Sequence, residues 1–366
     1  MKATQMLHQA GQSLWLDNIT RDLLASGTLE RYVDELAITG LTSNPTIFDH
    51  AFQTGDAYDD AIRAAAHGGG SPAAVFFTLA IDDLRAAADL FRGIWDRTDG
   101  VDGWVSLEVS PTLAYDTQDT IEAAATLFAR ADRPNLFIKI PGTAEGLPAI
   151  EEAIFAGVPV NVTLLFSVEH YLAAADAYMR GIERRVEAGL DPAVGSVASL
   201  FVSRWDSAPE STGQPPDLHD RLGIAQARRA YGAYRELLDS ARWQRLANEG
   251  ARPQRLLWAS TCTKDPDASD VLYVRALAAP LTVNTMPEKT LLAFADHGEV
   301  GELLPADGGD ADRVIARFAA AGVDLNALAA RLQSEGAEKF VRSWDELIAT
   351  ISRKTQVLTA AGRGDG

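Results

Sequence analysis

Eight short apolar segments alternate with helical segments along the chain, and this alternation limits the possible folds more than any other feature. The eight segments are rich in Val, Ile, Leu and aromatic residues, and they mostly lack a strict apolar–polar alternation. Strands that are covered on both faces have this composition. The segments are Ser13–Ile19, Ala37–Asn44, Trp104–Ser110, Leu136–Pro141, Pro159–Phe166, Ser196–Val202, Arg255–Thr261 and Leu281–Met286.

Helical patterns separate these segments and continue beyond the last of them. A strand followed by a helix, repeated eight times, is typical of a (β/α)8 barrel, and an open doubly wound sheet is the competing arrangement. Because no break in composition divides the chain into halves, closure is favoured. We therefore predict an α/β fold in which residues 1–366 form a single TIM barrel domain with additional N-terminal and C-terminal helices. The expected helical segments are Thr20–Leu36, Pro45–Ile94 as a two-helix stretch, Thr117–Ala131, Glu145–Phe155, Val168–Glu187, Leu222–Ala247, Asp267–Leu277, Pro287–Phe294, Ala311–Ala321 and Leu325–Ile351.

Two segments are expected to lie outside regular structure. Residues 207–220 (SAPESTGQPPDLHD) are polar and rich in proline and follow the sixth strand, so we expect a surface loop there. Residues 360–366 at the end of the chain are expected to form a frayed tail.

The composition excludes several classes of protein. With 33 Lys and Arg against 51 Asp and Glu, the formal net charge of the 366 residues is −18, and without a basic stripe such a chain repels the phosphates of nucleic acids. No run of about 18 uncharged apolar residues suggests a membrane span. The single cysteine, Cys262, offers neither an internal disulfide nor a zinc cluster, and the first twenty residues lack a secretory signal. We therefore expect a cytoplasmic protein that binds neither nucleic acid nor membrane.

Polar residues stand at the ends of the predicted strands. In a TIM barrel the active site lies at the C-terminal ends of the strands, so these side chains would converge on one mouth. They are Asp17, Asn18, Thr42, Ser43, Asn44, Glu108, Lys139, Asn161, Thr163, Ser199, Arg204, Ser260, Thr261, Lys264 and Asn284.

Lys139 is the most informative of these residues, because it stands between Ile138 and Ile140 in the fourth strand. Burying an ammonium group is costly, so a lysine in such surroundings tends to lose its proton. Lowering its pKa from about 10.4 to about 7 corresponds to about 4–5 kcal/mol. A neutral lysine attacks carbonyl carbons and forms a Schiff base. The alternative is a structural ion pair with Glu108 or Asp17.

Two further pairs of charged residues suit the same chemistry. Asp17 and Glu108 lie on different strands and could divide the proton transfers that a Schiff-base reaction needs, or could simply compensate the charge of the lysine. Arg204 and Lys264 could hold a phosphate, or could form surface ion pairs. In a chain this acidic, an anionic substrate needs such local cations.

Six segments that contain these residues resemble the transaldolase family. GLTSNPTIF at 40–48 and LFIKIPGTAEGL at 136–147 resemble its two long motifs, and LWLDNI at 14–19, SLEVSP at 106–111, NVTLLFS at 161–167 and SLFVSR at 199–204 resemble shorter ones. The matches follow family order over about residues 13–290. The chain length and the later segments WASTCTKDP, SDVLYV and LTVNTMP resemble the longer bacterial branch of this class I aldolase superfamily.

The resemblance implies a (β/α)8 barrel that transfers a dihydroxyacetone unit in the non-oxidative pentose phosphate pathway. The donor would be a ketose phosphate (sedoheptulose 7-phosphate or fructose 6-phosphate) and the acceptor an aldose phosphate (glyceraldehyde 3-phosphate or erythrose 4-phosphate). Because the lysine itself serves as the electron sink, the family needs neither a metal nor an organic cofactor. The protein would be a monomer or a homodimer whose partners are its sugar-phosphate substrates.

The resemblance also assigns roles to residues of this sequence. Lys139 matches the Schiff-base lysine, and Asp17 matches the acid/base at the C4 hydroxyl. Glu108 matches the group that, through a water helped by Thr163, serves formation and dehydration of the carbinolamine. The substrate-binding positions are Asn44 and Asn161 for the dihydroxyacetone hydroxyls, Ser199 and Arg204 for the phosphate, Phe201 as a lining aromatic, and Lys264 as a further candidate.

Two other functions remain as alternatives. One is an aldolase of the same superfamily that releases dihydroxyacetone instead of transferring it. Its small fructose-6-phosphate aldolase members are much shorter and usually carry an amide where this chain has Glu108, so that residue and the length favour transfer. The other alternative is a non-catalytic sugar-phosphate-binding barrel, which is disfavoured because the lysine and both carboxylates are present.

Overall fold

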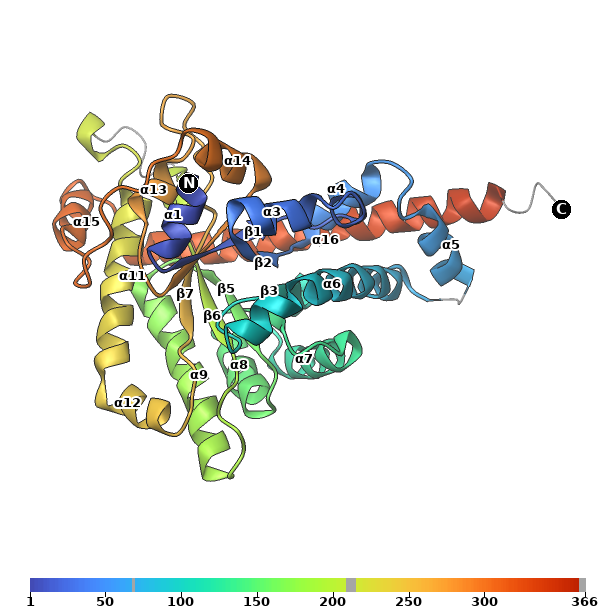
Figure 1. Ribbon diagram of the computed structural model, residues 1–366, viewed down its shortest axis with the longest axis horizontal. Helices are drawn as coiled ribbons and strands as arrows, with labels where there is room; N and C mark the ends of the chain where they lie inside the picture. Colours follow the sequence, from blue (N-terminus) through green and yellow to red (C-terminus); the bar gives the residue numbers. More distant parts are fainter. Residues whose placement is uncertain (68–69, 209–214, 362–366) are drawn as a thin grey trace.

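Eight parallel strands form a closed barrel in the computed structural model, which describes residues 1–67, 70–208 and 215–361 (Figure 1). Each strand pairs in parallel with the next one in the sequence, and β8 pairs with β1. The prediction of a closed TIM barrel rather than an open sheet is therefore confirmed. The strands are β1 (Gln12–Asp17), β2 (Ile38–Thr42), β3 (Trp104–Glu108), β4 (Leu136–Pro141), β5 (Val160–Leu165), β6 (Ser196–Phe201), β7 (Arg255–Ala259) and β8 (Thr282–Met286).

The strands are buried along nearly their whole length, which explains why they lack an apolar–polar alternation. All residues of β2 to β8 are buried, and in β1 only the terminal Asp17 is partly exposed. The register places Glu108 beside Lys139 and Lys139 beside Asn161, and it places Asp17 beside Thr42. Polar residues of neighbouring strands therefore meet at one end of the barrel.

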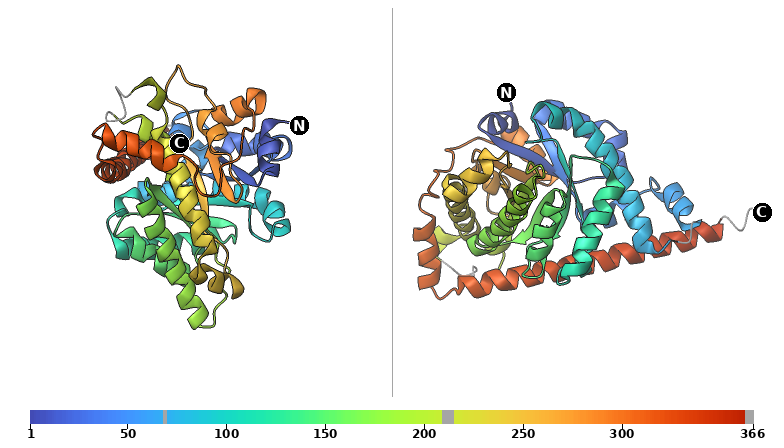
Figure 2. Two further views of the ribbon diagram at one scale, coloured as in Figure 1. Left: turned by 90° about the vertical axis from the view of Figure 1, so that its left-hand side faces the viewer. Right: turned by 90° about the horizontal axis from the view of Figure 1, so that it is seen from below.

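Helices surround the barrel and extend beyond it (Figures 1 and 2). The α-helices are α1 (Ala3–Gln9), α2 (Arg21–Ala25), α3 (Thr28–Leu36), α4 (Pro45–Gln53), α5 (Asp59–His67), α6 (Pro72–Arg97), α7 (Thr117–Ala131), α8 (Gly146–Phe155), α9 (Val168–Glu187), α10 (Ser203–Asp206), α11 (Leu222–Asp239), α12 (Ala241–Asn248), α13 (Leu272–Ala276), α14 (Glu288–His297), α15 (Ala311–Ala320) and α16 (Leu325–Ala361). Short 3-10 helices, η1 (Pro111–Leu113) and η3 (Pro216–Leu218), accompany them.

Several expected helices are shorter or more divided than the sequence pattern predicts. The expected helix over 20–36 is interrupted at Gly27. The φ of this glycine is 71°, a left-handed conformation that separates α2 from α3. The segment 222–247 breaks at Ser240, which has an extended backbone and accepts a hydrogen bond from the Trp243 amide to begin α12. The segment 45–94 holds three helices instead of two, and helix forms over only the later half of 267–277.

The C-terminal helix α16 lies across the ends of the strands. It is 37 residues long and runs along one side of the molecule from α15 to beyond α5 (Figure 2, right). The Gln333 side-chain amide donates to the Gly142 and Leu164 carbonyls at 3.1 and 2.9 Å, just past β4 and at β5. Further along, the Trp344 ring packs edge-on against Phe76 of α6, with centroids 5.2 Å apart. These contacts fix α16 over the C-terminal end of the barrel.

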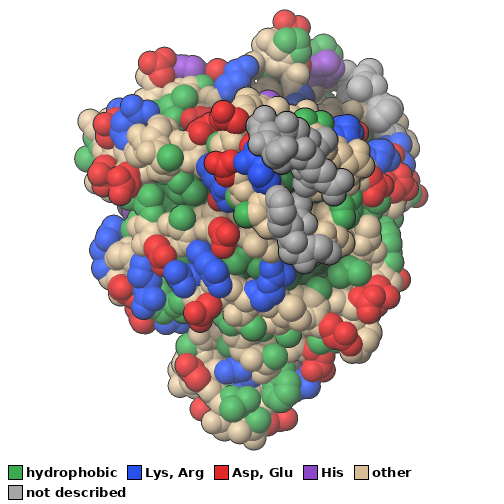
Figure 3. Space-filling view, turned by 90° about the vertical axis from the view of Figure 1, so that its right-hand side faces the viewer, with side chains coloured by type: hydrophobic (Ala, Val, Ile, Leu, Met, Phe, Trp, Pro, Cys, Tyr) green, Lys and Arg blue, Asp and Glu red, His purple; other side chains and the backbone are tan. Residues whose placement is uncertain are grey.

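Some sequence expectations concern segments that are only partly described. Within the predicted surface loop at 207–220, residues 209–214 lie outside the described residues. The same holds for residues 362–366 of the predicted frayed tail at 360–366. Among the helices that the structure does describe, none is long and apolar enough to cross a membrane. On the face of the molecule in Figure 3, acidic and basic side chains are interspersed.

Candidate active site

A cavity of about 940 Å³ lies at the C-terminal end of the barrel, beneath α16. It brings together most of the site residues that the sequence predicts. Those that line it are Asp17, Asn44, Lys139, Thr163, Ser199, Phe201, Arg204 and Lys264. The two remaining ones, Glu108 and Asn161, are buried and bond directly to Lys139 and Ser199 respectively.

The Lys139 side chain lies at the floor of this cavity and is only 7% exposed. Its Nζ is 3.2 Å from Oε2 of Glu108 and donates to the Ser43 carbonyl at 3.3 Å. The Phe340 ring of α16 lies 5.7 Å from the same nitrogen. The ion pair that the sequence offers as an alternative is thus present, and the nitrogen also borders the cavity, so one geometry accommodates both interpretations.

The Glu108 carboxyl is buried. Burial raises its pKa and the nearby Lys139 charge opposes that rise, with burial prevailing. Its Oε1 has no hydrogen-bond partner among the described residues, and neither has the buried Oγ1 of Thr163. A buried oxygen usually bonds to protein or to water, so both groups are available to a water or a substrate hydroxyl.

A bulge in β5 shapes the backbone around Thr163. The pairing of β5 with β6 shifts between Val162 and Leu165, and Leu164 has a φ of 60°. A leucine rarely adopts this left-handed conformation, and such strain is concentrated at functional sites. The Leu164 carbonyl is the one that accepts from Gln333 of α16, so the bulge also helps to seat the covering helix.

Asp17 lies at the end of β1 and borders the cavity. Its Oδ1 accepts from the Thr42 hydroxyl at 2.7 Å, and the Thr42 and Thr285 hydroxyls are 2.7 Å apart. Burial raises the pKa of Asp17, while the positive charge of Lys139 and the Thr42 hydrogen bond lower it. A carboxyl whose pKa is raised towards neutrality is suited to exchange protons with a substrate.

Two asparagines are held by the fold in different ways. Asn161 is buried, its amide donates to the Ser106 hydroxyl at 3.1 Å, and its oxygen accepts from the Ser199 hydroxyl at 2.7 Å. Asn44 is the N-cap of α4, because its side-chain oxygen accepts from the Ile47 amide at 3.1 Å. The capping bond fixes the Asn44 side chain and leaves its NH₂ group able to donate.

Arg204 provides a guanidinium group to the cavity. It belongs to α10, and its Cζ lies 4.7 Å from the centroid of the Phe201 ring and 5.8 Å from that of Phe340. No carboxylate within 4 Å pairs with it in the described part of the chain, and burial lowers its pKa. Lys264 stands exposed at the rim of the same cavity.

Helix α16 contributes two cations that the sequence interpretation missed. Lys339 and Arg342 line the cavity, and the pKa of Lys339 is lowered by burial and then by the charges of Arg204, Lys264 and Arg342. Four positive groups therefore line the cavity that Lys139 also borders, an arrangement that an anion would stabilise. The sequence predicts a helix over Leu325–Ile351, but its pattern does not indicate that the face with Lys339 and Arg342 borders the site.

No group of three or more His, Cys, Asp or Glu residues in the described ranges is placed to hold a metal ion. The site offers the Lys139 amine close to the Glu108 and Asp17 carboxyls, with cations lining the same cavity.

Comparisons with known proteins agree with this arrangement. The family described as transaldolase/fructose-6-phosphate aldolase matches residues 14–351. A protein named transaldolase from Mycolicibacterium paratuberculosis is 49% identical over 357 residues, covering 95% of this chain and 96% of that protein. Transaldolases from Frankia alni and Thermobifida fusca are each 46% identical, over 95% and 96% of this chain and 96% and 97% of their own. The chain therefore belongs to the transaldolase/fructose-6-phosphate aldolase family.

Proposed function

We propose that this protein is a transaldolase that transfers a dihydroxyacetone unit from fructose 6-phosphate or sedoheptulose 7-phosphate to erythrose 4-phosphate or glyceraldehyde 3-phosphate. This places it in the non-oxidative pentose phosphate pathway. The observation that carries the proposal is the buried Lys139 amine, 3.2 Å from the Glu108 carboxyl, at the floor of a cavity with cations across from it. Close relatives named transaldolase support the same function.

The first half of the reaction forms the Schiff base. Neutral Lys139 attacks the C2 carbonyl of the ketose phosphate, and the carbinolamine then loses water to give an iminium ion. Glu108 supplies and removes the protons of these steps through a water that the Thr163 hydroxyl orients. Their unpartnered oxygens, Oε1 and Oγ1, support this role because both can bond to that water.

The second half breaks and remakes a carbon–carbon bond. Asp17 takes the proton of the C4 hydroxyl, the C3–C4 bond breaks, and the electron pair moves into the iminium to give an enamine on Lys139. The aldose phosphate product leaves and the acceptor aldehyde takes its place. The enamine carbon attacks the aldehyde carbon, which forms the new carbon–carbon bond and restores the iminium. Asp17 then returns a proton to the new hydroxyl, and hydrolysis releases the product and the lysine, which gives ping-pong kinetics.

The remaining residues hold the substrate. Asn44 and Asn161 donate to the hydroxyls of the dihydroxyacetone unit, and Phe201 lines the sugar chain. Arg204, Ser199 and Lys264 bind the phosphate, Arg204 through a planar pair of hydrogen bonds. Because the donor and acceptor both carry a terminal phosphate, one such subsite serves both halves of the reaction.

Reductive trapping tests the mechanism. The full chain is incubated with fructose 6-phosphate and sodium borohydride, and the modified peptide is located by mass spectrometry. We expect a sugar-dependent adduct on Lys139, none in Lys139→Ala, and an adduct without turnover in Asp17→Asn. An adduct on another residue, or none at all, contradicts the proposal.

A second measurement separates transfer from simple cleavage. With fructose 6-phosphate, we expect sedoheptulose 7-phosphate to form only when erythrose 4-phosphate is added, with little free dihydroxyacetone. Rapid release of dihydroxyacetone that does not depend on the acceptor identifies an aldolase instead.

We further propose that residues 1–366 form one domain, that the protein is cytoplasmic, and that it is a monomer or a homodimer. The barrel and α16 support the first point, since the helix packs across strands and helices from the first half of the chain. Sedimentation of the purified full chain distinguishes the two oligomeric states.

A further inference from the structure

A second cavity lies at the opposite end of the barrel from the proposed active site. Its volume is about 360 Å³, which is within the range of small-molecule sites. Residues at the starts of several strands line it, among them Gln12 and Ser13 of β1, Trp104 of β3, Ser196 of β6 and Arg255 of β7. In TIM barrels this end usually serves stability alone, so an open cavity there is unusual.

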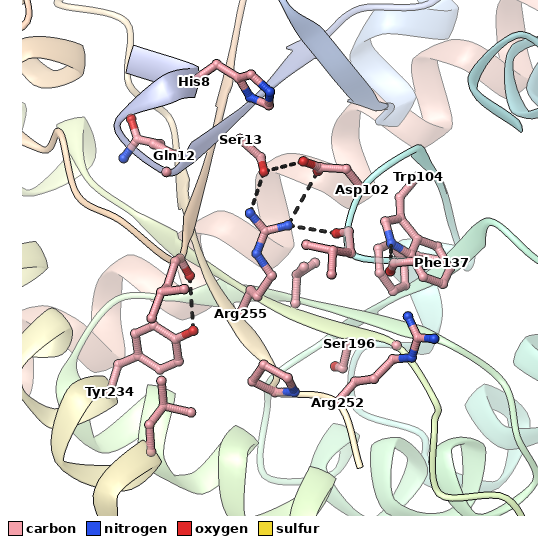
Figure 4. A pocket seen from close by; sticks show the side chains of 18 residues that line it. His8, Gln12, Ser13, Asp102, Trp104, Phe137, Ser196, Tyr234, Arg252 and Arg255 are labelled. Atoms are coloured by element: carbon pink, nitrogen blue, oxygen red, sulfur yellow. Dashed lines mark hydrogen bonds and ion pairs between the residues drawn. The ribbon is translucent and has the colours of Figure 1, made fainter. Parts of the chain in front are cut away.

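Both arginines of this cavity are paired with carboxylates: Arg255 with Asp102, and Arg252 with the exposed Asp99 outside the cavity, at 3.3 Å. Figure 4 shows Arg255 joined to Ser13 and Asp102. The Arg255 Nη1 lies 3.4 Å from Oδ1 of Asp102 and donates to the Val101 carbonyl at 2.8 Å, and Nη2 donates to the Thr282 carbonyl at 2.9 Å. The Ser13 hydroxyl donates to Asp102 at 2.5 Å. The cavity therefore offers no unpaired arginine or aspartate charge to an ion.

The Arg255 side chain of this ion pair has one hydrogen-bond donor that is not used within the described part of the chain. The Arg255 side chain is 11% exposed, and its two terminal nitrogens bond to Val101, Asp102, Ser13 and Thr282. Its Nε has no hydrogen-bond partner among the described residues, and an arginine carries a proton on that nitrogen. The cavity thus presents a donor that an uncharged acceptor can use.

The walls of the cavity are aromatic and apolar. The Trp104 and Phe137 rings stack with centroids 4.0 Å apart, and Tyr234 lies at the other side of Arg255 in Figure 4. The polar atoms of two of these rings are already bonded, because Trp104 donates to the Gly100 carbonyl at 2.9 Å and Tyr234 to the Leu281 carbonyl at 3.0 Å. Water against such walls has few partners, so an apolar ring that displaces it gains free energy.

The rim contains a strained residue. Leu281 lines the cavity, is 51% exposed, and has a φ of 63°. A leucine rarely adopts this conformation, and strained residues are concentrated at ligand-binding positions. Leu281 thus adds a conformationally strained apolar residue to the lining of this cavity.

We propose that this cavity is a second, non-catalytic site that binds a small, uncharged, planar aromatic molecule with one hydrogen-bond acceptor. The ring of the ligand lies against the apolar walls formed by Trp104 and Leu238, and its acceptor bonds to Nε of Arg255.

Coumarin is a suitable probe, because it is planar and uncharged and carries one lactone. We expect calorimetry on the full chain to give one site with a Kd of about 0.1–1 mM, as for other ligands of about eleven heavy atoms. Saturating fructose 6-phosphate should leave this Kd unchanged, and indole, which lacks the acceptor, should bind several-fold more weakly. Absence of binding, or competition with the sugar phosphate, overturns the proposal.

Two variants locate the site. Leu238→Trp fills the cavity from α11 and should weaken coumarin binding about tenfold or more, whereas Leu237→Trp changes a neighbouring, partly buried leucine outside the cavity and should not. Leu281→Gly removes part of the rim and relieves the backbone strain, so it should weaken binding without lowering the melting temperature. Equal affinity in Leu238→Trp and Leu237→Trp overturns the proposal. If Leu238→Trp does not fold, an unchanged affinity of Leu281→Gly for coumarin overturns the proposal.

Discussion

Among single residues, Glu108 and Lys139 make the contact on which the proposed chemistry depends. We expect Glu108→Gln to keep the size of the side chain and to remove its proton transfer, which lowers kcat by about 10²–10⁴-fold. The rate at which borohydride traps the sugar adduct should fall as well. Glu335→Gln is the control, because Glu335 also lines the cavity but is exposed and pairs only loosely with Arg331, at 3.8 Å. Full activity of Glu108→Gln would assign this glutamate a merely structural role.

Asp206 gives a residue-level prediction about pH. It lies two positions after Arg204 and accepts hydrogen bonds from the Leu222 and Gly223 amides and from the Tyr273 hydroxyl. Burial raises its pKa to about 6, against an ordinary value of 3.8, although these hydrogen bonds oppose the rise. A carboxyl with a raised pKa in the folded state stabilises that state most below pH 3.8, and this contribution is lost as the pH rises through 6.

Ionisation of Asp206 therefore lowers the free energy of unfolding between about pH 4 and 6, by at most about 3 kcal/mol. Asp206→Asn does not ionise, and its side chain can still accept from the amides of α11. We expect the difference in unfolding free energy between this variant and the natural protein to change over that pH range. Urea denaturation at a series of pH values measures it, and parallel curves would show that the ionisation of Asp206 has no effect on folding.

Among the elements, α16 turns an open barrel mouth into a cationic cavity. We expect Lys339→Ala and Arg342→Ala each to raise KM for fructose 6-phosphate several-fold, because each removes one charge near the phosphate. The value of kcat/KM for unphosphorylated fructose should not change. Arg353→Ala is a control on the same helix, since Arg353 is exposed and lies outside the cavity. Equal effects on both sugars would mean that these cations do not recognise phosphate.

The same helix marks the limit of what the sequence predicts. The strands and the residues at their ends could be inferred because burial on both faces gives strands a distinctive composition, and barrel closure brings strand ends such as Glu108 and Lys139 together. The place of Lys339 and Arg342 in the cavity could not be inferred, because an amphipathic pattern identifies a helix but does not show where that helix packs. The helix breaks at Gly27 and Ser240 could not be inferred either, because each depends on the backbone conformation of a single residue.

At the scale of the whole molecule, the two ends of the barrel have separate tasks. The proposed chemistry lies at the C-terminal ends of the strands, and the Asp102–Arg255 pair lies at the other end, separated by strands of about 17–20 Å. Asp102 is 4% exposed and accepts from Ser13 and from Trp15 Nε1, at 3.2 Å. Through these bonds and those of Arg255 to Ser13 and Thr282, the pair joins β1, β7 and β8 at the end of the barrel away from Lys139.

We expect Asp102→Ala to lower the free energy of unfolding by about 3–5 kcal/mol, because it leaves the buried Arg255 charge without its partner. At a temperature where the variant is folded, kcat should change less than about twofold, since the charge lies a strand length, about 17–20 Å, from the site. Asp99→Asn removes the charge of an exposed partner of Arg252, keeps a side chain that tolerates the left-handed φ of 51°, and should barely alter stability. Urea denaturation and turnover measured on the same samples test both points. A large loss of kcat in folded Asp102→Ala would mean that the two ends of the barrel are coupled, and that a ligand in the second cavity could act on the reaction.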